Sequence, residues 1–170
     1  MIAEHHGKMP RIGEGTFIAP DAVVIGDIEI GRDCSLWFGV KMRGDVHYIT
    51  VGERTNIQDG TICHVTLDKW PLLIGSNVTI GHGAIVHGCV IHDETLIGMG
   101  AKVLDGAEIG RHSLVAAGSL VREGEKVPEG VLVAGVPAMI KRKLTSAEID
   151  NIIASAERYV KYKEDYLRMF

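Results

Sequence analysis

Three histidines carry the chemistry that this sequence offers most clearly. His64 follows Cys63, and His82 and His87 lie five residues apart in the run IGHGAIVHGC (80–89). Neutral imidazole is a common metal ligand, and a catalytic zinc ion usually has three protein ligands and one open position. The residue types therefore favour a metal centre, and the alternative is three unrelated histidines on a solvated surface.

The elements that must position these side chains follow from a repeat of six residues. Four consecutive hexads, IGMGAK, VLDGAE, IGRHSL and VAAGSL, cover residues 97–120. Each begins with an aliphatic residue and has alanine or serine in its fifth place. A helix does not fit, because six is not a multiple of 3.6 and such frequent glycines break helices. Short strands joined by tight turns fit, with three hexads in each triangular coil and the aliphatic residue inside.

The repeat predicts a mainly β fold, a left-handed parallel β-helix over residues 1–135. Residues 136–170 would form a crossing segment and one C-terminal helix packed on the outside of the coils. The run from Thr145 to Glu148 (TSAE) has the pattern of a capping box, and apolar residues then recur at helical spacing. The hexads slip at residues 42–50 and at VTLDKWPLL (65–73), and such slips are where a regular solenoid admits function.

The repeat also places the histidines. The residue before His64 and the residue before His87 each open a hexad, and with residues 65–73 looped out they stand three hexads apart, which is one coil. His64 and His87 therefore share a slot on successive coils and point outward, ~4.8 Å apart. His82 lies on a different face, so a neighbouring chain would have to supply it to the same metal ion. We expect a homotrimer with a metal site at each interface.

Composition limits the other functions. The formal net charge of −4 at pH 7 offers no basic face for nucleic acid. No run of ~20 apolar residues exists, so no membrane partner is expected. The three cysteines include no CxxC pair, which predicts no disulfide framework, and the N-terminus lacks the apolar core of a signal peptide. We therefore expect a cytoplasmic protein.

The chain resembles the gamma-class carbonic anhydrase family, in its short type that is also labelled ferripyochelin-binding-protein-like, within the hexapeptide-repeat superfamily. The resemblance covers nearly the whole chain, and its most specific parts are NIQDG and IGHGAIVHGC. The matching stretches are RGD (43–45), NIQDG (56–60), CH (63–64), IGHGAIVHGC (80–89), LIGMGA (96–101) and AGVPA (134–138).

This resemblance implies a homotrimer in which His64 and His87 of one subunit and His82 of the next are the metal ligands. The metal would be Zn²⁺, and Fe²⁺ or Co²⁺ would also suit three imidazoles. A metal-bound hydroxide at each interface would hydrate carbon dioxide, the small-molecule substrate, to bicarbonate in a reversible reaction.

Five further residues have roles by the same resemblance. Gln58 would hydrogen-bond the hydroxide or bicarbonate, and Arg43 and Asp59 would form part of the site wall. Arg43 and Asp45 would link subunits, and a purely structural pair is the alternative for them. Tyr159 matches a tyrosine that reaches toward the metal in shorter members of the family, and a core-facing aromatic is the alternative for it.

Two departures from the family bear on activity. The loop after His64 contains no glutamate, where the archetypal enzyme carries a glutamate proton shuttle, and Val46 replaces a second active-site glutamate. His92 is a candidate substitute for the shuttle. Alternatives to a hydratase therefore stay open: a metal-stabilised trimeric scaffold without turnover, an acyltransferase that uses acyl-coenzyme A with a histidine as general base, and a thioesterase.

Overall fold

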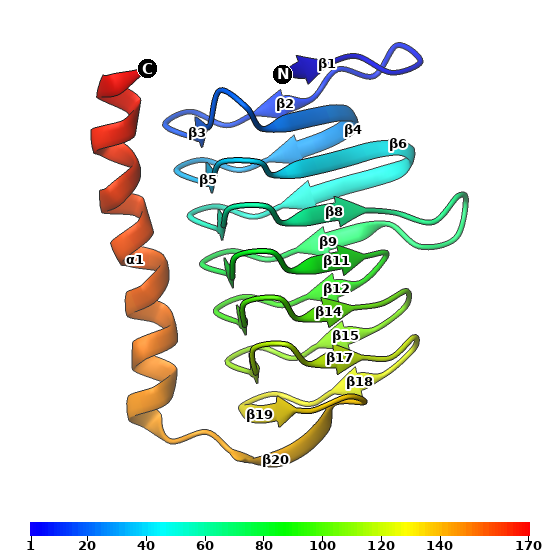
Figure 1. Ribbon diagram of the computed structural model, residues 1–170, viewed down its shortest axis with the longest axis vertical. Coiled ribbons are helices and arrows are strands. Elements are labelled where there is room, and N and C mark those ends of the chain that lie inside the picture. The colour runs from blue at the N-terminus through cyan, green and yellow to red at the C-terminus, as the bar shows by residue number, and fades with distance from the viewer.

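Hexads pair with hexads one coil away, as their spacing predicts. Ile97 pairs with Val115 and Val103 pairs with Val121 in parallel ladders, so partners are 18 residues, or three hexads, apart. The computed structural model, which describes residues 1–170, is a β-solenoid of about seven coils with one C-terminal helix (Figure 1). The predicted mainly β class is confirmed, and the left hand of the coil stays a prediction.

Each coil presents three faces, and two sheets describe them because the long strands β4 and β6 continue from one face to the next. The first face consists of β3 (Phe17–Ile18), β5 (Ser35–Leu36), β7 (Asn56–Ile57), β10 (Thr79–Ile80), β13 (Leu96–Ile97), β16 (Leu114–Val115) and β19 (Val131–Ala134), with β20 (Met139–Lys143) at its end. The second face consists of β8 (Ile62–His64), β11 (Ile85–His87), β14 (Lys102–Val103) and β17 (Leu120–Val121). The third consists of β9 (Leu72–Ile74), β12 (Val90–Ile91), β15 (Glu108–Ile109) and β18 (Lys126–Val127). The strands β4 (Val23–Ile30) and β6 (Lys41–Val51) join the last two faces, and β1 (Ile2–Ala3) and β2 (Arg11–Ile12) pair with β4.

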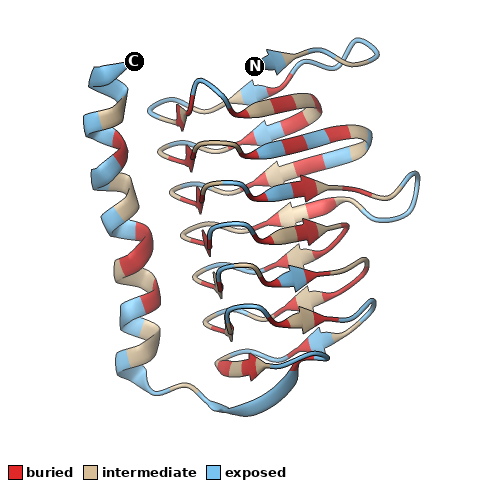
Figure 2. Cartoon of the chain, in the orientation of Figure 1, coloured by how far each residue is buried: buried red, intermediate tan, exposed pale blue.

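The aliphatic residue that opens each hexad lies in a narrow core, as predicted. Ile80, Ile97 and Ile109 are fully buried, and Figure 2 shows buried residues recurring along every coil. The small residues in the fifth place are buried as well, and Ser113 donates a hydrogen bond to the carbonyl oxygen of Pro128 on the next coil at 2.8 Å. Burying one Ile side chain contributes ~1.5–3 kcal/mol, so the stacked coils share one continuous source of stability.

The predicted slips in the repeat are confirmed as two departures from regular coils. β4 has 8 residues and β6 has 11, and their register shifts between Gly26 and Ile28. Residues 65–71 form a loop between β8 and β9 that protrudes from the coils and contains an antiparallel bridge between Thr66 and Trp70 (Figure 1). Both departures lie next to β8, the strand that ends in His64.

The helix α1 (Ser146–Met169) begins at the predicted capping box. The Thr145 hydroxyl accepts a hydrogen bond from the backbone N–H of Glu148 at 3.3 Å, and the Glu148 carboxylate accepts one from the N–H of Thr145 at 2.9 Å. The helix packs outside the first face and buries Ile152 and Ala156, as predicted, and it returns along the coils toward the first of them (Figure 1). It does not combine the length and the apolar character that crossing a membrane requires.

The last coil ends differently from the predicted crossing segment, because the chain forms another strand before the helix. β20 runs back antiparallel to β19. Next to it, the N–H of Ala138 donates to the carbonyl oxygen of Leu120 on β17 at 2.7 Å. The final coil is therefore covered by its own chain on two of its three sides.

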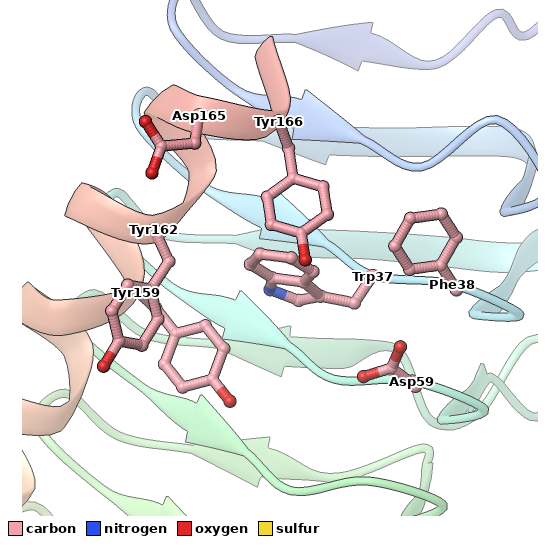
Figure 3. Close-up of a pocket in the computed structure, with 7 residues that line it drawn as sticks. All are labelled: Trp37, Phe38, Asp59, Tyr159, Tyr162, Asp165 and Tyr166. Atoms are coloured by element: carbon pink, nitrogen blue, oxygen red, sulfur yellow. The ribbon is translucent and has the colours of Figure 1, made fainter. Parts of the chain in front are cut away.

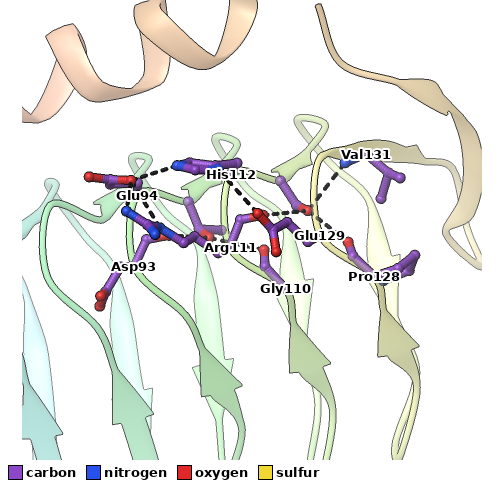
Figure 4. A network of polar contacts seen from close by, with 10 residues as sticks. Asp93, Glu94, Gly110, Arg111, His112, Pro128, Glu129 and Val131 are labelled. Carbon is purple, nitrogen blue, oxygen red and sulfur yellow. Dashed lines mark hydrogen bonds and ion pairs between the residues drawn. The ribbon is translucent and has the colours of Figure 1, made fainter. Parts of the chain in front are cut away.

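Ion pairs link three successive coils at one corner (Figure 4). The Glu94 carboxylate accepts hydrogen bonds from Arg111, at 2.6 Å, and from His112, at 2.6 Å, on the next coil. Glu129, one coil further, lies 3.3 Å from the other ring nitrogen of His112. Burial raises the pKa of Glu94, but the hydrogen bonds from Arg111 and His112 lower it by more, so the pKa lies below its usual range.

The three cysteines are buried free thiols, which agrees with the prediction of no disulfide framework. Burial raises the pKa of Cys34 to about 11 and that of Cys63 to about 12, so neither is a nucleophile at neutral pH.

Candidate metal centre

His64 and His87 are stacked on successive coils, as the hexad count predicts. They are register partners on β8 and β11, and their ring centroids are 5.0 Å apart. The Nδ1 atom of His64 and the Nε2 atom of His87 face one another at 3.0 Å. The stacking depends on the loop after His64, whose residues lie outside the coil. The remaining residues between His64 and His87 make one turn of the coil, so the two histidines lie on successive coils.

A carboxylate binds the far nitrogen of each of these rings. Asp45 Oδ1 lies 3.0 Å from His64 Nε2, and Asp105 Oδ1 is within hydrogen-bond distance of His87 Nδ1. Burial raises the pKa of both carboxyls, but the hydrogen bonds that they accept lower it by more. Asp45 accepts hydrogen bonds from His64 and Arg43, and Asp105 accepts them from Thr66 and His87. The pKa of each carboxyl therefore lies below its usual range.

These carboxylates decide what can lie between the two rings. An ionised carboxylate only accepts hydrogen bonds, so each far nitrogen must carry the proton of its ring. In a neutral imidazole the other nitrogen is then a lone pair, which leaves two lone pairs facing at 3.0 Å. A cation relieves their repulsion, and nitrogens bound ~2.0–2.1 Å from one metal ion can lie this close together. The pair thus fits a metal ion, and a shared proton is the alternative.

Arg43 belongs to the same place. Met42 on β6 pairs with Cys63 on β8, so the next residues along the two strands, Arg43 and His64, are neighbours. Arg43 also forms an ion pair with Asp45 and keeps about half of its side chain exposed. We call Arg43, Asp45, His64 and His87 the His64 cluster.

A second group forms at another edge of the coils. Ile57 pairs with Ile80, so Asp59 and His82 share the slot two residues further on, and Asp59 Oδ2 lies 2.8 Å from His82 Nδ1. Gln58 is buried beside them, and its amide nitrogen donates to Asn56 Oδ1 at 3.0 Å. The Nε2 atom of His82 has no hydrogen-bond partner in the chain.

Tyr159 of α1 completes this second group. It lines a cavity of about 410 Å³ together with Gln58 and His82. It also lines a neighbouring pocket together with Asp59 and Trp37, and its ring centroid lies 5.6 Å from that of Trp37 (Figure 3). Burial raises the pKa of Tyr159, and the charge of Asp59 raises it further. We call Gln58, Asp59, His82 and Tyr159 the His82 cluster.

The eight residues predicted for the site thus fall into two clusters of four. The chain by itself brings no three His, Cys, Asp or Glu side chains into one group that could hold a metal ion. Two imidazoles lie at one edge and the third at another, in agreement with the expectation that His82 cannot join the other two within its own chain.

Two residues beside the His64 cluster, Asp105 and Thr66, are not among the residues predicted for the site. Asp105 binds His87, and the Thr66 hydroxyl donates to the other oxygen of Asp105 at 2.6 Å. The hexad repeat could have predicted Asp105, because it places this carboxylate, the third residue of its hexad, on the coil next to His87. His92 lies beside Glu108 on the third face at 2.7 Å and belongs to neither cluster, so its expected shuttle role gains no support.

Known proteins resemble this chain along nearly its whole length. Residues 9–44 and 88–123 match the family model described as bacterial transferase hexapeptide (six repeats). Gamma carbonic anhydrase 2, mitochondrial, of Arabidopsis thaliana is 47% identical over 158 residues, which are 90% of this chain and 57% of that relative. The chain therefore spans little more than half the length of this plant protein.

Two other relatives match over nearly their full length. A carbonic anhydrase of Geobacillus kaustophilus is 40% identical over 166 residues, 98% of this chain and 91% of that protein. The crystal structure of a hexapeptide transferase family protein from Anaplasma phagocytophilum has a TM-score of 0.94 at 41% identity, with 98% of each chain covered.

Proposed function

This chain belongs to the gamma-class carbonic anhydrase family, and from that premise we propose that it is a metal-dependent enzyme that interconverts carbon dioxide and bicarbonate in a homotrimer. One observation carries the proposal: His64 Nδ1 and His87 Nε2 face one another at 3.0 Å, a carboxylate binds the far nitrogen of each ring, and His82 lies at another edge of the coils. Two edges that each hold part of a ligand set are what an interface between identical subunits would join.

The metal ligands in this proposal are His64 Nδ1, His87 Nε2 and His82 of the partner subunit. Zn²⁺ is the expected ion, with Fe²⁺ or Co²⁺ as alternatives, because three imidazoles suit all three. A divalent ion bound there would supply a Lewis acid that lowers the pKa of water toward ~7. The residue types support this fit, since metal-binding histidines commonly donate their second N–H to a carboxylate, as His64 and His87 do here, and the Asp59 carboxylate lies 2.8 Å from His82 Nδ1.

The chain's other residues would position the substrate. The Gln58 amide is held by Asn56 and lines the cavity beside His82, where it would hydrogen-bond bicarbonate. Leu96 and Met99 give the same cavity apolar walls, which suit carbon dioxide because it is uncharged. The Arg43 side chain, which is about half exposed, would attract the bicarbonate anion and hold Asp45 against His64.

Carbon dioxide hydration must also release a proton for each bicarbonate formed. The loop after His64 has no glutamate, and His92 lies on the third face with Glu108. We therefore expect the proton to leave through solvent and buffer, so that the hydration rate rises with buffer concentration.

The test combines metal content with turnover. The purified protein is loaded with zinc or, anaerobically, with ferrous iron, and carbon dioxide hydration is followed by stopped flow. We expect about one metal ion per chain, its loss in His64→Ala, and full retention in the matched control His92→Ala. In Gln58→Ala we expect full metal content with slower hydration.

The outcomes separate the alternatives. Metal bound through these histidines with hydration at background in both metal forms would leave a metal-stabilised scaffold. Metal-independent turnover of an acyl-coenzyme A would instead favour transferase or thioesterase chemistry, in which a histidine acts as general base.

A further inference from the structure

A chain of three side chains supports His87 from behind. Asp105, on the coil after His87, places Oδ1 against His87 Nδ1. Its second oxygen accepts a hydrogen bond from Thr66 Oγ1 at 2.6 Å. Thr66 belongs to the protruding loop after β8, so the loop reaches across a coil to hold the carboxylate that holds the histidine.

This arrangement favours a proton on Nδ1 of His87. Both oxygens of Asp105 have a donor, one from the loop and one from the imidazole. While Nδ1 of the neutral ring donates to Asp105, the lone pair of the ring lies on Nε2, which faces His64. The carboxylate behind His64 has a different support, since Asp45 is held by Arg43 rather than by the loop.

The loop has a fitted seat on the coils. The Trp70 ring lies over Gly106, where an added Cβ would come within 2.9 Å of it, and an added Cβ at Gly88 would come within 2.8 Å of the Trp70 Cβ. The backbone N–H of Thr66 donates to the carbonyl oxygen of Trp70 at 3.0 Å, which ties the two residues together. Two glycines therefore leave the room that lets Trp70 anchor Thr66 above Asp105.

We propose that Asp105, held by Thr66, is a positioning residue that presets the tautomer and the orientation of His87 for metal binding. The loop that interrupts the hexads is in this view a built part of the metal centre. The inference rests on the proposed function in one respect, that His87 is a metal ligand.

The first measurement is zinc affinity, determined on the assembled protein by competition with a chelator. Loss of a carboxylate behind a metal-binding histidine typically weakens affinity 10–100-fold, and we expect a Kd increase of about this size in Asp105→Asn. Thr66→Val should raise Kd by a smaller factor. Glu108→Gln is the matched control, because it removes the carboxylate from His92, a pair of the same kind at 2.7 Å, and should leave Kd unchanged.

The second measurement needs no metal. Nitrogen-15 NMR of the metal-free protein should show the His87 proton on Nδ1 in the wild type and a shift of the population toward Nε2 in Asp105→Leu. A role limited to seating the loop would lower thermal stability in Thr66→Val without moving either Kd or the tautomer. If Asp105→Leu does not fold, Asp105→Asn and Thr66→Val carry the test.

The outcomes keep the two ideas apart. Zinc binding that His87→Ala leaves unchanged would refute the proposed metal centre, and the NMR result would still decide whether Asp105 sets the tautomer. Zinc binding that His87→Ala abolishes, with Asp105→Asn and Thr66→Val as tight as the control, would overturn the positioning role.

Discussion

Two inactive variants should restore metal sites in each other if subunits share ligands. The chain keeps His64 and His87 at one edge and His82 at another, and it forms no three-ligand group alone. A His64→Ala chain still offers His82, and a His82→Ala chain still offers the intact pair. Each variant alone should lack metal at every site, whereas a mixed trimer can complete some of them.

The size of the recovery follows from the assembly. A complete site needs a His82→Ala chain on the side that supplies the pair and a His64→Ala chain on the side that supplies His82. In random trimers from equal amounts, each condition holds for half of the chains, so about one quarter of the sites should be complete. The recovered fraction should be greatest at equal amounts and fall to zero at either extreme.

The assay uses chains that are co-expressed with two different tags, purified through both, and verified as mixed trimers by native mass spectrometry. Selection for both tags removes the pure trimers, so the recovery per mixed trimer should be one third, which is one complete site of three. Zinc is counted per trimer. Verified mixed trimers that hold no zinc would refute the shared-ligand arrangement, and so would a wild-type protein that is monomeric.

Three further outcomes test the fold. Gly124→Ala, at φ +67 in open space, should lower the free energy of unfolding in urea by ~1–2 kcal/mol. Gly106→Ala should lower it by more, because the added Cβ would also meet the Trp70 ring. Equal losses in the two variants would contradict the packing of Trp70 on Gly106. The pKa of Glu94 lies below its ordinary 4.5, so its stabilising effect is present above pH 4.5 and is lost as pH falls through the lower folded value. Thermal unfolding at pH 7 and pH 3 should therefore show a steeper loss for the wild type than for Glu94→Gln. A thiol reagent at pH 8 should modify none of the three cysteines, Cys63 included, before unfolding and all three afterwards; a reactive thiol in the folded protein would contradict their burial.

The six-residue repeat predicts those parts of the molecule whose positions recur from coil to coil. The buried place of Ile97, the coil length and the pairing of His64 with His87 all follow from one rule, because each step of six residues moves the chain to the next face. The N-terminus of α1 was equally predictable, since the Thr145 and Glu148 pair is local in sequence.

The parts that it missed depend on segments without a period. The path of the loop after β8 decides that Thr66 meets Asp105, and nothing in the hexads sets that path. The strand β20 was likewise unforeseen, because its residues pair only after the chain has turned back. How Tyr159 meets the cavity beside Gln58 depends on how the helix docks, and helical spacing fixes a face of the helix but not its partner.

The covering of the last coil has a consequence for how far such a molecule can extend. A stack of near-identical rungs has no intrinsic length, because its terminal rung presents the same open hydrogen-bonding edge to a newcomer that it presented to its predecessor. Here β20 lies across that edge at β19, the backbone at Ala138 occupies it at β17, and Pro128, which has no N–H, follows β18. The chain thereby terminates its own template, and a molecule cut short before β20 would be free to recruit others end to end into filaments.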